Sequence, residues 1–201
     1  MSIGHSRGGK TALWHGVTDE RVSATFPLMS GSGGNGAMRV LNEDPECDNG
    51  PTKPCGPAQD IADINYHFPY WFTPAFVNVS HNEARAPWDQ HFQRMLLAPR
   101  AQLGVEGINN QHENPLGSQI TWAAARTIYR WLGVDGKIGT FFHPGQHPMN
   151  DLPGEHDWTV VADFADTIQF GRMPRNASLF NTTAYSVPTL PWSWSAPSTP
   201  P

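Results

Sequence analysis

The pentapeptide Gly4-His5-Ser6-Arg7-Gly8 is the feature that most constrains what this chain can fold into. Residues 2–4, which lead into it, have the pattern of a strand end. Thr11-Ala12-Leu13-Trp14 begins a helical pattern that we expect to stop at Gly16. A G-x-S-x-G sequence between a strand and a helix places its serine on a strained turn where only glycines leave room. We therefore predict that Ser6 is an exposed nucleophile. The alternative is a tight glycine turn without chemistry.

Beyond this turn the chain alternates strand and helix patterns, which is typical of a parallel α/β sheet. Apolar residues at 3.6-residue spacing predict helices, with Gly133 as a helix end and Asp157 as an N-cap. We predict an α/β fold in which helices flank a parallel sheet as a three-layer sandwich. The predicted strands are residues 22–28, 102–106 and 138–142, and the predicted helices are residues 88–97, 118–132 and 158–170.

The segments outside these elements have no clear period. Between the glycine-rich run at residues 31–36 and residue 88 we expect a long irregular loop. It contains Cys47 and Cys55, and a disulfide and two reduced thiols are both compatible with the sequence. From residue 172 onward Pro, Ser and Thr dominate. We therefore expect residues 172–201 to be a solvated C-terminal extension. Trp192 and Trp194 either pack against the folded domain or make no contact with it.

Composition narrows the possible partners. Thirteen basic and eighteen acidic side chains give a net charge of −5, which disfavours binding to nucleic acid or to an anionic membrane surface. No stretch reaches the roughly eighteen apolar residues of a membrane span, and the first residues lack the apolar core of a secretory signal. We expect neither nucleic acid nor a membrane as a partner.

A serine hydroxyl needs a base, so the nine histidines have to be sorted. In hydrolases of this architecture the histidine follows the last strand and precedes the last helix, a window that contains His143, His147 and His156. We choose His147 because it lies deeper in its loop; an ordinary exposed loop histidine is the alternative. The Pro-Gly pair between His143 and His147 prevents a shared helical face, so we predict no metal site.

Several short blocks follow one another in order between Gly4 and about Phe170. They are Gly4-His5-Ser6-Arg7-Gly8-Gly9-Lys10, Ser30-Gly31-Ser32-Gly33-Gly34, Phe68-Pro69-Tyr70-Trp71-Phe72, Asp89-Gln90-His91, Leu97-Ala98-Pro99-Arg100 and Gly145-Gln146-His147. Together these blocks resemble the glucuronoyl esterases of carbohydrate esterase family 15. The resemblance implies a secreted serine esterase with an α/β-hydrolase fold and no cofactor, which cleaves the ester between lignin alcohols and 4-O-methyl-glucuronic acid on xylan.

The resemblance also implies roles for single residues. Ser6 would be the nucleophile, His147 the general base, Arg7 a donor to the oxyanion and Lys10 a contact of the sugar acid. The planar guanidinium of Arg7 suits an oxyanion or a uronate oxygen, although a surface ion pair would also explain it. Lys10 lies one helical turn past Ser6, and a solvated lysine is its alternative. The aromatic candidates for stacking on a sugar are Trp71, Trp88 and His112, although core packing is common for such residues.

The acid of the triad is the weak point of the resemblance. Many family members carry a glutamate directly before the Ser-Gly-x-Gly-Gly run, where this chain has Met29. The other family position, after the strand predicted at residues 102–106, falls near Asn110. Glu113 is the nearest carboxylate beyond that strand and Glu106 the nearest within it. We choose Glu113, because Glu106 would more easily point into the sheet.

Family members are also implied to have several strands ahead of the nucleophile. On that ground we expect residues 1–171 to be the C-terminal half of an α/β-hydrolase catalytic domain, an incomplete sheet with an exposed strand edge. Glycosylation sequons at Asn78, Asn176 and Asn181 agree with a secreted protein. From the resemblance we expect a monomer that acts on glucuronoxylan or another lignin–carbohydrate ester. Two alternatives stay open: an esterase for acetyl or other carbohydrate esters, and a truncated or degenerate fold without catalysis.

Overall fold

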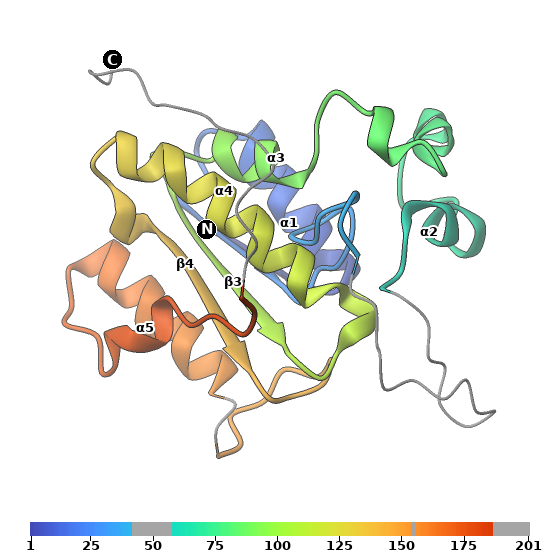
Figure 1. Ribbon diagram of the computed structural model, residues 1–201. Helices are drawn as coiled ribbons and strands as arrows, with labels where there is room; N and C mark the ends of the chain where they lie inside the picture. The colour runs from blue at the N-terminus through green and yellow to red at the C-terminus, as the bar shows by residue number, and fades with distance from the viewer. Residues whose placement is uncertain (42–57, 154–155, 187–201) are drawn as a thin grey trace.

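The computed structural model describes residues 1–41, 58–153 and 156–186. These residues form a parallel sheet with the strand order β1-β2-β3-β4, made of β1 (Ser2–His5), β2 (Ala24–Leu28), β3 (Ala101–Gly107) and β4 (Ile138–His143) (Figure 1). The three strands expected after the first turn are confirmed, with ends shifted by one or two residues. Cys47, Cys55, Trp192 and Trp194 lie outside the described residues.

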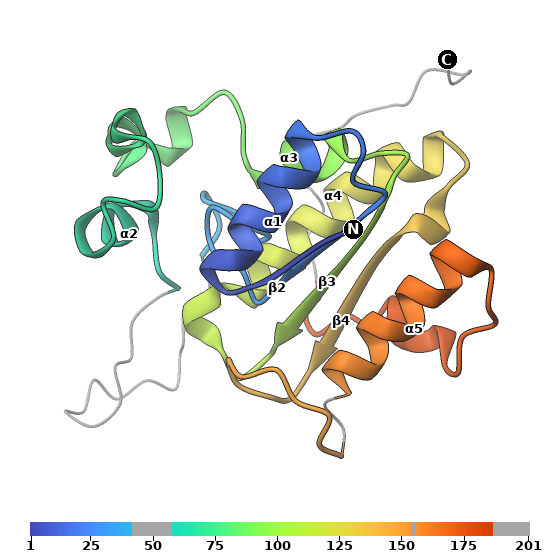
Figure 2. The same ribbon diagram turned by 180° about the vertical axis from the view of Figure 1, so that it is seen from behind.

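Helices cover both faces of the sheet, so the three-layer sandwich is confirmed. Three helices, α1 (Arg7–Thr18), α3 (Gln90–Leu96) and α4 (Pro115–Trp131), follow β1, β2 and β3 and cover one face. The opposite face packs against α5 (Asp157–Phe170), and Figures 1 and 2 show α4 and α5 on opposite sides. Side chains alternate accordingly: Thr25 faces Gly16 of α1, whereas Phe26 meets Phe164 of α5 edge to face.

The two faces of the sheet differ in chemistry. Toward α5 the core is apolar, with Leu28, Leu103 and Phe141 fully or almost fully buried. Toward α3 and α4 it is polar: Arg94 donates through Nε to Gln102 at 3.0 Å, and Gln102 donates to the Tyr129 hydroxyl at 2.9 Å. A polar core of this kind is stable only where its groups are hydrogen-bonded.

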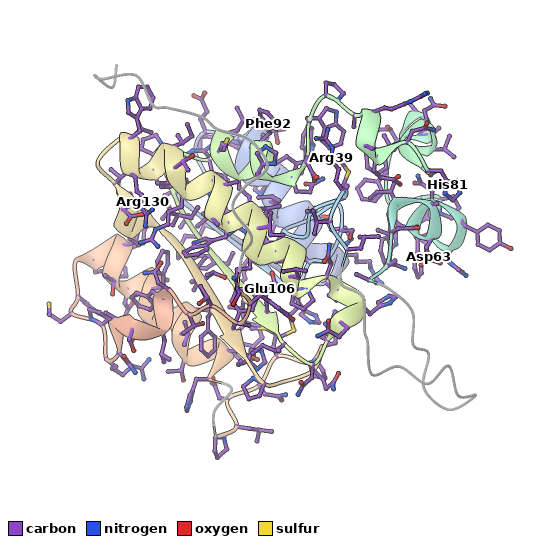
Figure 3. All side chains as sticks on the ribbon, viewed as in Figure 1. Arg39, Asp63, His81, Phe92, Glu106 and Arg130 are labelled. Carbon is purple, nitrogen blue, oxygen red and sulfur yellow. The ribbon has the colours of Figure 1, made fainter. Side chains whose placement is uncertain are left out.

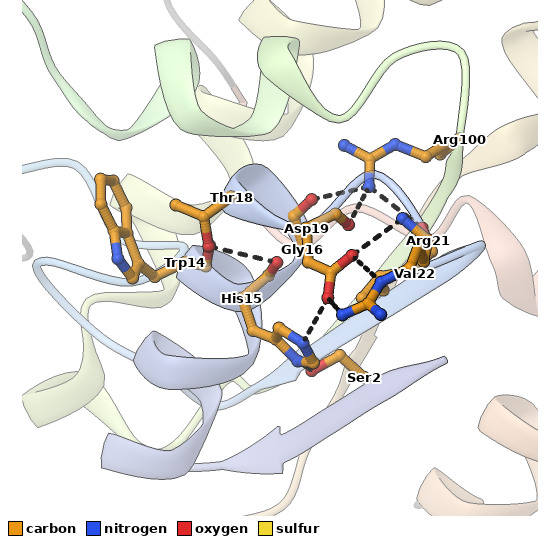
Figure 4. Close-up of polar contacts among 9 residues, drawn as sticks. All are labelled: Ser2, Trp14, His15, Gly16, Thr18, Asp19, Arg21, Val22 and Arg100. Atoms are coloured by element: carbon orange, nitrogen blue, oxygen red, sulfur yellow. Dashed lines mark hydrogen bonds and ion pairs between the residues drawn. The ribbon is translucent and has the colours of Figure 1, made fainter.

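The helix ends correct part of the sequence reading. The first helix begins at Arg7, directly after the turn, rather than at Thr11, and it continues past Gly16 to Thr18. Gly16 serves packing, because a Cβ there would lie 2.3 Å from the Thr25 hydroxyl oxygen. Beyond Thr18, Arg100 donates through Nη1 to the carbonyl oxygens of Gly16, Asp19 and Val22, which ties down the end of the helix (Figure 4).

The end predicted for α4 is confirmed, and the cap predicted for α5 is wrong. Gly133 has a φ of 72°, and its backbone N–H donates to the Arg130 carbonyl oxygen. This left-handed conformation is typical of a helix end. In α5 the N-cap is His156, with a φ of 53°, and Asp157 is the first helical residue. The Asp157 carboxylate turns inward instead, where it accepts from the Asn150 backbone N–H at 2.7 Å.

Two further segments are more ordered than expected. The stretch read as an irregular loop contains the helix α2 (Ile61–His67), capped by Asp60, and two 3₁₀ turns, η1 (Pro74–Val79) and η2 (Glu83–Arg85). In the tail, η5 (Ala177–Phe180) packs Phe180 into the core against Phe164, so a solvated extension is wrong for this part. The division of the chain at residue 171 stays a prediction.

The described sheet has β1 at one edge and β4 at the other. Among the described residues β1 pairs only with β2, and Ile3 on this edge strand is 51% exposed. No helix of the described residues is both long and apolar enough to cross a bilayer.

Candidate active site

Ser6 sits on the turn between β1 and α1 in a strained conformation. Its φ is 56° and its ψ is −129°, a backbone conformation that residues other than glycine rarely adopt. The turn is held because Ser6 donates its backbone N–H to the Leu28 carbonyl at 2.9 Å. Gly4 is required by sterics, since a Cβ there would lie 2.0 Å from the Gly8 carbonyl oxygen, whereas a Cβ on Gly8 would meet nothing within 4 Å.

Ser6 opens into a cavity of about 1400 Å³. The cavity brings together most of the residues singled out from the sequence, and aromatic side chains from the segment between β2 and α3 form one wall. His112 and Glu113 are not among the lining residues. The predicted residues that line it are Ser6, Arg7, Lys10, Trp71, Trp88 and His147, and the other large aromatic side chains there are Trp14, Tyr70, Phe72, Phe76 and Phe92.

His147 presents its ring to the cavity and has two polar neighbours at Nδ1. The side-chain amide nitrogen of Asn110 lies 2.9 Å away, and Oε1 of Glu113 lies 3.8 Å away. Burial lowers the pKa of His147 below the usual value; the negative charge of Glu113 opposes this shift, and the charges of His5, His112 and Lys10 add to it. The imidazole is therefore biased toward its neutral, basic form.

The two candidate carboxylates have different surroundings. Glu113 lies near His147 with 12% of its side chain exposed. Glu106 is buried in the polar core between the sheet and α4 (Figure 3), where Oε1 accepts from Asn35 at 3.0 Å and burial raises its pKa to about 8. Met29 is fully buried in the apolar core. Of the two carboxylates considered for the acid, Glu113 is the one that contacts His147, and Asn110 lies nearer to the same ring nitrogen.

Lys10 projects from α1 into the loop that follows β2. Its Nζ donates to the carbonyl oxygens of Ser30 at 2.5 Å and Ser32 at 2.8 Å, and it lies 5.8 Å from the centre of the Trp71 ring. Burial lowers the pKa of Lys10 to about 8, and the charges of Glu113 and Glu106 oppose the shift. The ammonium is therefore held in place rather than solvated.

The N-terminus of α1 supplies donors beside Ser6. Arg7 is the first helical residue, so its backbone N–H has no acceptor within the helix, and its exposed side chain lines the cavity. Free N–H groups and the positive end of a helix favour a developing negative charge. An oxyanion formed at Ser6 would have these donors within reach.

The aromatic candidates separate into two groups. Trp71 stacks on Phe68 with the ring centroids 4.0 Å apart, and its Nε1 is buried without a hydrogen-bond partner among the described residues. Trp88 also lines the cavity, whereas His112 is exposed and its backbone carbonyl accepts from Gln59. Trp71 and Trp88 are therefore placed to meet a ligand, and His112 is not among the cavity residues.

The other histidines of the window have different surroundings. His143 is buried, and its Nε2 lies 3.1 Å from Oδ1 of Asp157, so this pair ties the loop between β4 and α5 to the helix. His156 is exposed at the start of α5. Among the described residues no group of three or more metal-ligating side chains comes together.

Sequence reasoning missed two contacts at this site. It identified Asn110 only as a residue in the place of an acid, and it gave His5 no role. The structure places the His5 ring against His147 with the centroids 4.4 Å apart. The position of His5 beside the nucleophile was the available signal.

A strained serine between strand and helix, a helix N-terminus beside it and a histidine after the last described strand are the arrangement of the nucleophile turn in the α/β-hydrolase fold. A family model described as glucuronyl esterase of fungi matches residues 2–133. The chain therefore belongs to the glucuronyl esterase family.

Three relatives illustrate the likeness. A 4-O-methyl-glucuronoyl methylesterase of Phanerochaete carnosa is 32% identical over 179 residues, which cover 89% of this chain and 41% of that protein. A carbohydrate esterase family 15 glucuronoyl esterase from Caldicellulosiruptor kristjansonii superimposes with a TM-score of 0.83 at 28% identity, covering 97% of this chain and 49% of that one. A mutant glucuronoyl esterase from Sporotrichum thermophile, in complex with methyl 4-O-methyl-β-D-glucopyranuronate, has a TM-score of 0.70 at 23% identity, covering 92% and 47%. The chain spans less than half of the length of each of these relatives.

Proposed function

We propose that this chain carries the serine and histidine of a carboxylic-ester hydrolase that cleaves glucuronoyl esters, such as those joining lignin alcohols to 4-O-methyl-glucuronic acid on xylan. The observation that carries the proposal is that Ser6, on its strained turn, opens into the same cavity as His147, Arg7 and Lys10. No cofactor is needed for this reaction.

The reaction would take place in two steps. Nε2 of His147 takes the proton of the Ser6 hydroxyl while Oγ attacks the ester carbonyl, and the carbonyl oxygen becomes an anion that accepts hydrogen bonds from Arg7. Collapse of this intermediate breaks the bond to the alcohol, which leaves with the proton from His147. A water molecule, deprotonated by His147, then attacks the Ser6 ester. The bond between the acyl carbon and Oγ breaks, His147 returns the proton to Oγ, and glucuronate is released.

The triad would be completed by Glu113, with Asn110 beside it. For Nε2 to act as a base, Nδ1 of His147 must hold the proton and donate it to an oxygen. The carboxylate of Glu113 at 3.8 Å offers negative charge, and the amide of Asn110 at 2.9 Å offers an oxygen when that end of the amide faces the ring. The two residues would share the task that a single carboxylate performs in a serine triad.

Selectivity for a uronate would come from the charged side of the cavity. Lys10 and Arg7 are cations on α1, and the Trp71 side chain lines the same cavity. These groups suit the oxygen atoms of a sugar acid better than an acetyl group, while the rings of Trp71 and Trp88 offer flat apolar faces to a pyranose.

The test is hydrolysis of benzyl glucuronate by the wild-type chain and its Ser6→Ala variant, followed by release of benzyl alcohol. We expect turnover in the wild type and none above background in Ser6→Ala. Equal turnover in both would refute the proposal. With p-nitrophenyl acetate as a neutral comparison, Lys10→Met should impair glucuronate ester cleavage much more than acetate cleavage; an equal effect on both would favour an esterase for other carbohydrate esters.

The competing reading is a fold without catalysis. It is favoured by the amide of Asn110 as the nearest neighbour of Nδ1 and by the buried Met29. A fluorophosphonate probe separates the two, because it labels only an activated serine. A folded chain whose Ser6 never labels would support the non-catalytic reading.

We also propose a secreted monomer that acts on glucuronoxylan, in keeping with the enzymes that the chain resembles.

A further inference from the structure

His5 is the last residue of β1 and directly precedes Ser6. Its Nε2 lies 2.7 Å from the backbone carbonyl oxygen of His147. A carbonyl oxygen can only accept a hydrogen bond, so Nε2 of His5 carries a proton in the neutral ring as well as in the charged ring. The bond therefore persists in both protonation states of His5.

The loop that carries His147 has far to reach. His147 follows β4, Ser6 follows β1, and these two strands are the outer strands of the described sheet (Figures 1 and 2). Three intervals between neighbouring strands amount to roughly 14 Å. The loop has to cross the carboxyl ends of β2 and β3 before His147 meets the turn at Ser6.

The contacts of this loop follow its path across the sheet edge. Near β4, Gly145 donates its backbone N–H to Nδ1 of His143 at 3.0 Å and accepts from the Asn109 backbone at 3.2 Å. Further along, Asn110 contacts the His147 ring at 2.9 Å. At the far end the carbonyl of His147 accepts from His5, which belongs to the nucleophile's own strand.

We propose that His5 is a positioning residue, which fixes the backbone of His147 to the nucleophile turn so that the imidazole stays directed at Ser6. The inference rests on the proposed function, because it takes His147 as the base. The ring of His5 adds a second contact, since it packs against the His147 ring at 4.4 Å with an angle of 45° between the planes. His5 itself takes no proton from the substrate in this scheme.

A positive charge on His5 would support the same role of His147 as the contact does, because it favours the neutral, basic form of the His147 ring. Four charged or titratable groups influence His147: Glu113, His5, His112 and Lys10. A positive charge on His5 disfavours a second positive charge on the adjacent ring, so it keeps His147 neutral toward lower pH. His5→Gln retains an N–H donor at similar reach and loses this charge, which separates the two effects.

Kinetics provide the first test. In His5→Leu we expect kcat for benzyl glucuronate to fall between about tenfold and a hundredfold, because a lost hydrogen bond and a displaced base affect the chemical step, while KM changes less than twofold. His5→Gln should recover kcat to within about threefold, with its acid limb moved to higher pH. His15→Leu, on the same helix–strand unit but at the opposite end of α1, is the matched control and should behave as wild type. A His5→Leu variant with unchanged kcat, or no recovery in His5→Gln, would overturn the proposal.

A spectroscopic test does not depend on activity. In long-range ¹⁵N–¹H spectra of the wild-type chain, the neutral form of His5 should carry its proton on Nε2, and the His147 signals should shift or broaden in His5→Leu but not in His15→Leu. A His5 ring protonated on Nδ1, or unchanged His147 signals in His5→Leu, would refute the contact. If the wild-type chain hydrolyses no ester while these spectra are as expected, the proposed function fails and the His5 contact stands.

Discussion

The glycines of the serine turn offer a test in which two variants of the same motif should change stability in opposite directions. Gly4 and Gly8 flank Ser6 symmetrically in the sequence, but their surroundings differ. A Cβ on Gly4 would lie 2.0 Å from the Gly8 carbonyl oxygen, 2.3 Å from the Gly8 carbonyl carbon and 2.9 Å from the Gly9 nitrogen. A Cβ on Gly8 would meet nothing within 4 Å. Gly4→Ala and Gly8→Ala therefore form a matched pair.

The expected magnitudes follow from these contacts. Overpacking a well-packed core costs about 1–3 kcal/mol and occasionally more. The atoms facing Gly4 are backbone atoms of the first turn of α1, which cannot move aside alone. We expect Gly4→Ala to lower the free energy of unfolding by about 3 kcal/mol or more, a large fraction of the roughly 5–15 kcal/mol of a natural domain. Gly8 is helical, so Gly8→Ala should raise the free energy of unfolding by about 0.5–1 kcal/mol.

Urea unfolding followed by tryptophan fluorescence measures both changes, and the rate of fluorophosphonate labelling reports whether the Ser6 turn is intact. Gly4→Ala should lose both stability and labelling, while Gly8→Ala should unfold at a higher urea concentration than wild type. The reasoning is refuted if Gly4→Ala is as stable as wild type, or if Gly8→Ala is destabilised by more than about 1 kcal/mol.

Three further predictions concern the carboxylates. Glu113→Gln removes the negative charge that raises the pKa of His147, so the acid limb of the labelling rate should move to lower pH. The plateau should fall by about tenfold or more, because the imidazole loses the charge that stabilises its protonated form; an unmoved acid limb would contradict this. Burial raises the pKa of Glu106 to about 8, so the folded state binds its proton more tightly, and the contribution of Glu106 to stability is lost as the pH rises from about 4.3 to 8. Urea unfolding at pH 5 and pH 8 should show a smaller loss of stability in Glu106→Gln than in wild type, and an equal loss would count against it. Asp157→Ala removes the carboxylate beside the buried His143 and the acceptor of the Asn150 N–H, so it should cost about 2 kcal/mol or more in thermal unfolding; a loss below about 1 kcal/mol would show that these contacts do not hold the loop.

The layers of the fold could be predicted because their signals are local. Strand β3 and helix α4 each carry a run of buried residues whose spacing is visible within one segment, and Gly133 marks the helix end through its own left-handed conformation. Such signals require no knowledge of distant residues. The same is true of the Ser6 turn, because the close contacts that require glycine at position 4 are with Gly8 and Gly9 of the same segment.

The parts that were missed depend on distant partners. The wall of the cavity is built from aromatic pairs, such as Phe72 with Phe76 at 4.3 Å between ring centroids, whose sequence reads as an irregular loop. Asp157 has the sequence position and residue type of an N-cap, but its carboxylate contacts the buried His143 at the end of β4. Phe180 follows a stretch without periodicity, yet it fills a gap in the core. In each case tertiary contact decided what local pattern left open.

The proposed acid of the triad shows why spacing alone was insufficient. Asn110 and Glu113 belong to the same 3₁₀ turn, η3 (Gln111–Glu113): Asn110 is its N-cap and Glu113 is its last residue. In a 3₁₀ helix, residues three apart lie above one another, so both side chains point to the same place. That place is Nδ1 of His147, 2.9 Å from one and 3.8 Å from the other. From the sequence, the expected place of the acid falls near Asn110, and Glu113 is chosen over Glu106 as the carboxylate. The turn brings Asn110 and Glu113 together at one site, in which the amide is suited to orient the imidazole and the carboxylate to supply its charge.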